Sequence, residues 1–132
     1  MLFRSGFFDE VCYTGTGSAR TVTHNLGVAP ELMIVKSRGS VTDWFVYSST
    51  LGATKWLWLN DTGTGSTGST IWNNTAPTSS VFSVGTSGNV NGSGGTYVAY
   101  LFATCAGVSK VGTYTGTGTT LQIDCEIGRA HV

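Results

Sequence analysis

The longest strand-like run in the chain is Thr96-Tyr97-Val98-Ala99-Tyr100-Leu101-Phe102-Ala103. It is rich in β-branched and aromatic residues, and the turn signal Gly92-Ser93-Gly94-Gly95 stands directly before it. A run of this kind bounded by a turn predicts a β-strand. Because it is the longest such run, we expect it at the centre of a sheet.

Shorter runs of the same kind flank it. They are Arg20 to His24, Glu31 to Lys36, Asp43 to Tyr47, Lys55 to Leu59 and Val81 to Val84. The run from Glu31 to Lys36 is apolar between two charges, which predicts a strand covered on both faces. No window shows a helical apolar stripe, and short strands separated by turns are typical of sandwiches. We therefore predict an all-β fold, an antiparallel β-sandwich of jelly-roll type.

The composition narrows the class of protein further. A length of 132 residues suits one domain, and an apolar fraction of 40% argues against disorder despite 19 Gly. Seven basic residues balance seven acidic ones and form no basic stripe that could neutralise phosphates, so we expect no nucleic acid partner. No apolar run approaches the roughly 18 to 20 residues that span a bilayer, so membrane insertion is not expected. Residues 1–10 also lack the features of a secretory leader.

A short internal repeat organises the chain. Tyr13-Thr14-Gly15-Thr16-Gly17 recurs identically as Tyr114-Thr115-Gly116-Thr117-Gly118. We therefore expect a lead-in over residues 1–10, a complete β module over 11–109, and the start of a second, truncated repeat over 110–125. Residues 126–132 resemble the translation of a sequencing adapter and are interpreted as an artefact. Residues 113–125 are expected to be loosely held.

The cysteines and the histidine give no sign of a metal site or a catalytic triad. Cys12, Cys105 and Cys125 lack the spacing of zinc ligands, so free thiols are expected, with a Cys12–Cys105 pair left open. Once residues 126–132 are set aside, His24 is the remaining histidine, and no nucleophile motif accompanies it. We expect a structural role for His24, either with a ring nitrogen bonded to loop backbone or as a half-exposed packing group.

The acidic residues are scattered. Apart from Glu126 in the expected artefact, they are Asp9, Glu10, Glu31, Asp43, Asp61 and Asp124, and they mostly flank strands, where edge-protecting roles are usual. No calcium loop or phosphate-binding glycine loop accompanies them. The sequence thus predicts no enzyme activity and no cofactor.

The aromatic residues are the stronger functional candidates. Trp44, Trp56, Trp58 and Trp72, with Tyr47, are many for a chain of this size. Most such rings belong to a core, although planar rings can also stack on the faces of sugars. Alternation places Trp56 and Trp58 on one face of their strand.

The most exposed of these rings is expected to be Trp72. It is followed by Asn73 and Asn74 and lies near the polar, low-complexity loop from Asn60 to Thr70. We therefore select Trp72, Asn73, Asn74 and Trp58 as candidate ligand-binding residues.

Several motifs in order carry a family resemblance. They are Tyr13 to Gly17, Arg20 to Gly27, Pro30 to Lys36, Trp72 to Gly85 and Gly95 to Ala103. Over roughly residues 11–125 the chain resembles a repeated module of tail and appendage proteins of tailed bacteriophages, itself a domain of unknown function. The resemblance implies a non-enzymatic β module of the virion, assembled in the bacterial cytoplasm and used in tandem.

The resemblance also implies partners. These are neighbouring repeats of the same protein, host-surface polysaccharide as a candidate ligand, and homo-oligomer formation of the full-length protein. No binding residue is carried over, because the function of the family is poorly defined.

Three hypotheses follow from the sequence. The first is a structural module of a phage tail fibre or appendage that contacts host-surface glycan. The second is a carbohydrate-binding module of a secreted bacterial enzyme. The third, a hydrolase fragment, is disfavoured by the lone histidine and the scattered acids.

Overall fold

The computed structural model of the protein describes residues 6–127. Residues 1–5 of the expected lead-in and residues 128–132 of the expected artefact lie outside this range. The elements are β1 (Phe8–Thr14), β2 (Arg20–Thr23), β3 (Leu32–Ser37), β4 (Phe45–Ser48), β5 (Lys55–Trp58), β6 (Ser66–Thr67), β7 (Val81–Val84), α1 (Gly88–Asn91) and β8 (Thr96–Phe102).

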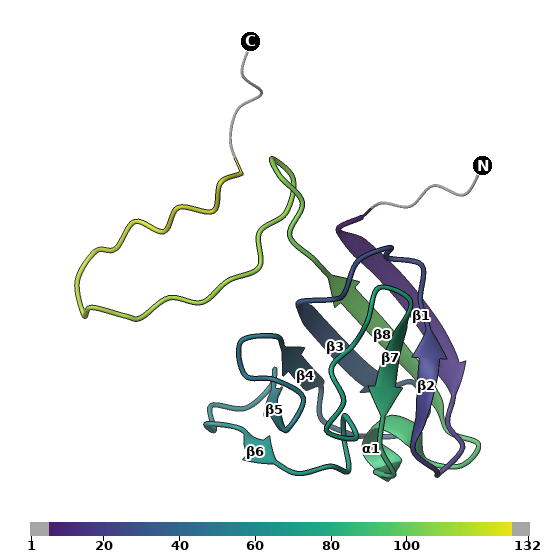
Figure 1. Cartoon of the computed structure of the whole chain (residues 1–132). Coiled ribbons are helices and arrows are strands. Elements are labelled where there is room, and N and C mark those ends of the chain that lie inside the picture. The colour runs from purple at the N-terminus through teal and green to yellow at the C-terminus, as the bar shows by residue number, and fades with distance from the viewer. Residues whose placement is uncertain (1–5, 128–132) are drawn as a thin grey trace.

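The strands form two antiparallel sheets. The larger has the order β1-β8-β3-β4-β5-β6 and the smaller pairs β2 with β7. In Figure 1 the β2–β7 pair lies across one face of the larger sheet, with α1 at one end of it. This sandwich-like arrangement confirms the predicted antiparallel all-β class. The strand β8 pairs with β1 and β3, so it is an interior strand, although it lies next to the edge strand β1 and not at the centre of the sheet.

The connectivity does not confirm a jelly roll. A jelly roll combines two Greek keys in its two sheets. Here β3, β4, β5 and β6 follow one another in a single sheet as a meander, and only two strands form the opposing layer. The prediction of a sandwich is therefore confirmed at the level of layers and not of jelly-roll topology.

Two strands differ from the sequence-based expectation. The strand β1 begins at Phe8, three residues before the expected start of the module at Val11. The short strand β6 lies inside the polar, low-complexity segment from Asn60 to Thr70, which we expected to be a loop. It pairs with β5 through backbone hydrogen bonds, which do not depend on apolar side chains.

The strand β3 shows why only one face of the larger sheet is fully buried. Met33 and Val35 are 1% and 0% exposed on the core face, whereas Leu32, Ile34 and Lys36 on the other face are half-buried. The expectation that this strand is covered on both faces is therefore wrong. The reason is that the two-stranded sheet covers only one side of the larger sheet.

The core lies between the two sheets and is centred on aromatic contacts. The ring of Tyr13 stacks on that of Tyr97 with centroids 5.3 Å apart, and it meets the edge of Phe82 at 5.9 Å. Val84 and Leu101, both 0% exposed, close the same cluster. These contacts connect β1, β7 and β8, so β8 is held by both layers.

Residues 110–127 contain no helix or strand. They leave the sandwich after a bridge between Cys105 and Ser109 and extend away from both sheets as a long loop (Figure 1). Almost every residue of this segment is exposed. Residues 113–125 are thus exposed and belong to neither sheet.

The register of β1 and β8 answers the question about the cysteines. Cys12 faces Val98, and Cys105 lies beyond Phe102, the end of β8, which is itself roughly 13 Å along the strand from Val98. A disulfide requires Cα atoms within about 7 Å. Cys12, Cys105 and Cys125 are all free, as expected.

Candidate functional site

His24 has the structural role that the sequence suggests. Its ring is 4% exposed, and its Nδ1 accepts a hydrogen bond of 3.1 Å from the backbone N–H of Leu26. The other ring nitrogen, Nε2, therefore carries the proton and donates it to the carbonyl oxygen of Thr78 at 2.9 Å. The prediction of a ring nitrogen bonded to loop backbone is confirmed, and both nitrogens are engaged.

The acidic side chains accept hydrogen bonds from backbone N–H groups and do not converge on a common site. Asp9 accepts the N–H of Asn25 at 2.7 Å, Glu31 accepts the N–H of Thr104 at 2.7 Å, and Asp61 accepts the N–H of Thr62 at 2.6 Å. Such bonds fix turns and the ends of strands. Among residues 6–127, no group of three His, Cys, Asp or Glu side chains could hold a metal ion. No helix of this part of the chain is long and apolar enough to cross a membrane.

Trp72 is buried, so the expectation of an exposed ring is wrong. Its side chain is 1% exposed and packs edge-on against Tyr47 with centroids 6.1 Å apart. Backbone bonds explain this position: the N–H of Gly85 donates to Ile71 at 2.7 Å, and that of Ser87 donates to Thr70 at 3.0 Å. These bonds draw the turn into the sandwich, so neither face of the Trp72 ring is open to a ligand.

Asn73 and Asn74 remain at the surface. Both have left-handed backbone angles, with φ of 53° and 49°, and both side chains are exposed. Asparagine tolerates this conformation better than most residues, which accounts for its use in the turn. Neither carboxamide hydrogen-bonds to another residue within 6–127, so the pair is accessible but has lost its expected aromatic neighbour.

Trp58 is half-buried and belongs to an aromatic cluster. Its ring lies 6.4 Å from that of Trp56 and 6.4 Å from that of Phe45, in edge-to-face arrangements. Both tryptophans lie on the core face of β5, as alternation predicts. The four predicted residues thus do not form one site, because Trp58 and Trp72 serve the core.

The most exposed tryptophan is Trp44, which was not selected from the sequence. It stands just before β4, with 36% of its side chain exposed. The backbone N–H of Trp44 donates to the side-chain oxygen of Asn60 at 3.0 Å, and the side-chain amide group of Asn60 donates to the carboxylate of Asp43 at 3.0 Å. Alternation alone does not signal this exposure, because Val46, which points to the same side as Trp44, is only 7% exposed.

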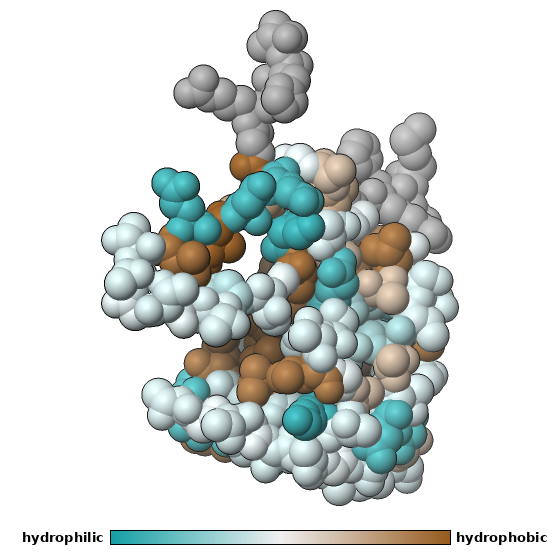
Figure 2. All heavy atoms as spheres, turned by 60° about the vertical axis from the view of Figure 1, so that its left-hand side comes forward, coloured by the Kyte–Doolittle hydropathy of each residue, from teal (hydrophilic) through white to brown (hydrophobic). Residues whose placement is uncertain are grey.

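The surface around Trp44 combines apolar and polar groups. Leu59, 61% exposed, donates its N–H to the carbonyl oxygen of Trp44 at 3.0 Å. We call the long loop of residues 110–127 the projecting segment. Figure 2 shows apolar surface between this segment and the part of the molecule that carries β4 to β6. A planar ring beside amide and carboxylate groups is the kind of surface that can stack on a sugar and bond its hydroxyls. We call Asp43, Trp44, Leu59 and Asn60 the Trp44 surface.

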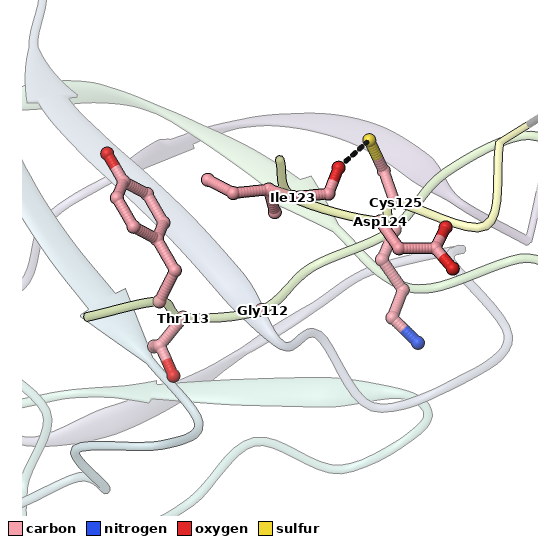
Figure 3. A pocket seen from close by; sticks show the side chains of 7 residues that line it. Gly112, Thr113, Ile123, Asp124 and Cys125 are labelled. Atoms are coloured by element: carbon pink, nitrogen blue, oxygen red, sulfur yellow. Dashed lines mark hydrogen bonds between the residues drawn. The ribbon is translucent and has the colours of Figure 1, made fainter. Parts of the chain in front are cut away.

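A cavity lies within the projecting segment. This cavity of about 210 Å³ separates the two limbs of the segment and is lined by Lys110, Gly112, Thr113, Tyr114, Ile123, Asp124 and Cys125. Figure 3 shows Ile123, Asp124 and Cys125 of one limb lying opposite Gly112 and Thr113 of the other. The base is closed by an ion pair of 2.9 Å between Lys110 and Glu126, and this hydrogen bond raises the pKa of Lys110. The cavity depends on exposed loop residues and presents no converging set of catalytic groups.

Comparisons with known proteins leave the function open. Neither the curated proteins nor the solved structures include a match to this chain. One family model, described as a domain of unknown function (DUF7483), matches residues 3–126. This match takes in both sheets and most of the projecting segment, and the chain therefore belongs to the DUF7483 family.

Proposed function

We propose that the chain is a non-enzymatic structural module of a bacteriophage virion protein, used in tandem in a tail fibre or another appendage. The observation that carries this proposal is the repeated Tyr-Thr-Gly-Thr-Gly motif: Tyr13 and Gly15 of the first copy are buried, whereas all five residues of the second copy are exposed. A neutral β-sandwich whose motif begins again outside its core suits a repeated architectural unit. The expected partners are neighbouring repeats, within a homo-oligomer of the full-length protein in the virion.

The roles of the polar side chains support the non-enzymatic part of the proposal. His24 uses both ring nitrogens to hold loops, and Asp9, Glu31 and Asp61 accept backbone N–H groups. Groups engaged in this way are poorly placed for proton transfer to a substrate.

Host-surface glycan is the ligand that we propose for the module, and the Trp44 surface is the part best suited to it. Trp44 is the most exposed of the four tryptophans, and Asp43 and Asn60 beside it supply hydrogen-bonding groups. Repetition would raise the strength of weak contacts, because linked modules bind with a high effective concentration. The same surface also favours the alternative function, a carbohydrate-binding module of a secreted bacterial enzyme.

The two functions are separated by the native locus. A long sequencing read through the codon for Cys125 should continue into another module beside capsid or tail genes if the chain is a virion part. A neighbouring signal peptide and glycosidase gene would instead establish the carbohydrate-binding alternative. Either result is independent of whether the isolated module binds a sugar.

The glycan ligand is tested by affinity electrophoresis in gels that contain bacterial surface polysaccharide. Trp44→Ala should abolish the retardation of the protein without changing its unfolding midpoint. Val28→Ala is the control, because it removes an exposed apolar side chain from the loop between β2 and β3, outside the Trp44 surface. Retardation that survives Trp44→Ala, or that Val28→Ala removes equally, would exclude the Trp44 surface as the glycan site.

A further inference from the structure

The two copies of Tyr-Thr-Gly-Thr-Gly share a local turn but not their surroundings. Gly17 and Gly118 have nearly the same left-handed φ, +78° and +76°. In both copies the hydroxyl of the threonine before that glycine donates a hydrogen bond to the carbonyl oxygen two residues further along the chain. Thr16 donates to Ser18 at 3.1 Å, and Thr117 donates to Thr119 at 3.4 Å. Yet Tyr13 is 9% exposed and Tyr114 is 70% exposed. The second copy thus holds the shape of the first without its contacts.

The contacts of the first copy define a specific binding site for the motif. The hydroxyl of Tyr13 donates to the carbonyl oxygen of Val90 at 2.7 Å, and its ring stacks on Tyr97. The N–H of Gly15 donates to Gly95 at 2.8 Å, and that of Gly17 donates to Asn91 at 2.7 Å. This binding site is formed by β8 and by residues 88–95, which comprise α1 and the turn after it. We call it the β8–α1 groove.

The glycines show that the second copy is shaped for the same groove. A Cβ atom on Gly15 would lie 2.2 Å from the carbonyl oxygen of Gly92, so this position admits only glycine. The equivalent Gly116 has nothing within 4 Å and no left-handed φ, so its present surroundings do not require glycine. A glycine that is needed only inside the groove indicates that the second copy is adapted to enter one.

We propose that residues 109–118 are a second docking strand and that they bind the β8–α1 groove of a second copy of this chain. The correspondence of Tyr114 with Tyr13 places Tyr114 opposite Tyr97 and Thr113 opposite Val98. The inference rests on the tandem use proposed above, but not on the virion location or on the glycan.

The competition with β1 explains why the segment is free in the single chain. Within residues 6–127 there are two copies of the docking motif and one β8–α1 groove. The second strand has Gly112 where the first has Val11, which packs against the core. The second strand therefore binds more weakly, and β1 holds the groove of its own chain. A docked second strand requires a copy whose β1 has been displaced.

The first test uses a labelled peptide of residues 109–120 and a full-length acceptor chain with Tyr13→Ala and Tyr114→Ala, in which both docking strands are weakened. The peptide should bind this acceptor at least about tenfold more tightly than the same peptide with Tyr114→Ala. Wild-type chain, whose groove is filled by β1, should bind neither. Binding that is insensitive to Tyr114→Ala, or equal binding to wild-type chain, would overturn the proposal.

A second test examines the register and does not depend on the folding of the acceptor variant. A C12S/V98C chain is mixed with a C12S/T113C chain, both with C105S and C125S, and held in mild urea under oxidising conditions. A dimer joined between positions 98 and 113 is expected. A chain that keeps Cys12 and carries V98C, with C105S and C125S, is the control and should cross-link within itself. If the control forms its 12–98 disulfide and the mixture yields no 98–113 dimer, the proposal is overturned. The virion assignment is tested separately, by sequencing the native locus.

Discussion

The side-chain oxygen of Asn91 accepts a hydrogen bond of 3.0 Å from the backbone N–H of Thr16. The amide nitrogen of the same side chain donates to Ser18 at 2.7 Å and to Gly85 at 2.7 Å. Asn91 is 0% exposed, so one buried carboxamide fastens the turn after β1 to the end of β7.

Replacing Asn91 with Asp should destabilise the module by at least about 2 kcal/mol. The carboxylate cannot donate to the oxygens of Ser18 and Gly85, and a buried group left unsatisfied costs about 1–3 kcal/mol. The free energy of unfolding in urea measures the effect. Asn89→Asp, at an exposed position in the same helix, is the control and should stay within about 0.5 kcal/mol of wild type.

Gly15→Ala and Gly116→Ala should differ in their effect on stability although the two glycines occupy the same place in the repeated motif. The new methyl group at position 15 would lie 2.2 Å from the backbone oxygen of Gly92, whereas that at position 116 meets nothing. We expect a loss of about 1–3 kcal/mol for Gly15→Ala and no change beyond about 0.5 kcal/mol for Gly116→Ala. Equal unfolding midpoints for the two variants would contradict the described environment of Gly15.

The stability of the module should fall as the pH rises above about 10. Burial is the main cause of a raised pKa for Tyr13, so the folded chain retains this proton after the unfolded chain has lost it. The unfolded state is then favoured by up to about 1.4 kcal/mol per pH unit for this group. Urea unfolding at pH 8, 9, 10 and 11 measures the slope.

Tyr13→Phe serves as the control for this pH dependence. It removes the hydroxyl that bonds Val90, so the variant should be less stable at pH 7 by about 1–3 kcal/mol. It should also lose stability less steeply above pH 10. Part of the slope will remain, because burial also raises the pKa of Tyr47. An unchanged slope in Tyr13→Phe would assign the alkaline effect to other tyrosines.

Trp72→Ala should cost about 3–5 kcal/mol of stability, as expected for truncating a buried aromatic ring. Trp72→Phe should cost clearly less, because it keeps most of the ring volume and removes an indole Nε1 that has no hydrogen-bond partner among the described residues. Thermal and urea unfolding distinguish the two variants. Should Trp72→Ala leave the unfolding midpoint unchanged, the buried position of the ring would be contradicted.

The strands of the module were largely predictable because alternation of apolar and polar residues is a local property. The runs that form β2, β3, β4, β5, β7 and β8 were each predicted within two residues at either end. The strand β1 was missed because Asp9, Glu10 and Cys12 interrupt its apolar residues. Those residues suit an edge strand whose second face is open, a position that only pairing with β8 creates.

The candidate site was less predictable because exposure depends on distant partners. The polar neighbours of Trp72 indicated a surface ring, yet backbone bonds from Gly85 and Ser87 draw its turn into the core. Trp44 stands directly before three buried residues, Phe45, Val46 and Tyr47, so its local sequence did not distinguish it from a core residue. His24 was interpreted correctly because its strand-end position implies nearby loop backbone.

The sequence by itself determined the β class, the long strand β8 and the repeated motif, because each of these depends on neighbouring residues. Only the tertiary structure decided that Tyr13 is buried while Tyr114 is exposed, and that Trp44 rather than Trp72 faces outward. The physical reason is the same in each case. Identical or similar local segments acquire different burial according to whether a distant strand or turn is available to cover them, and local sequence does not encode that availability.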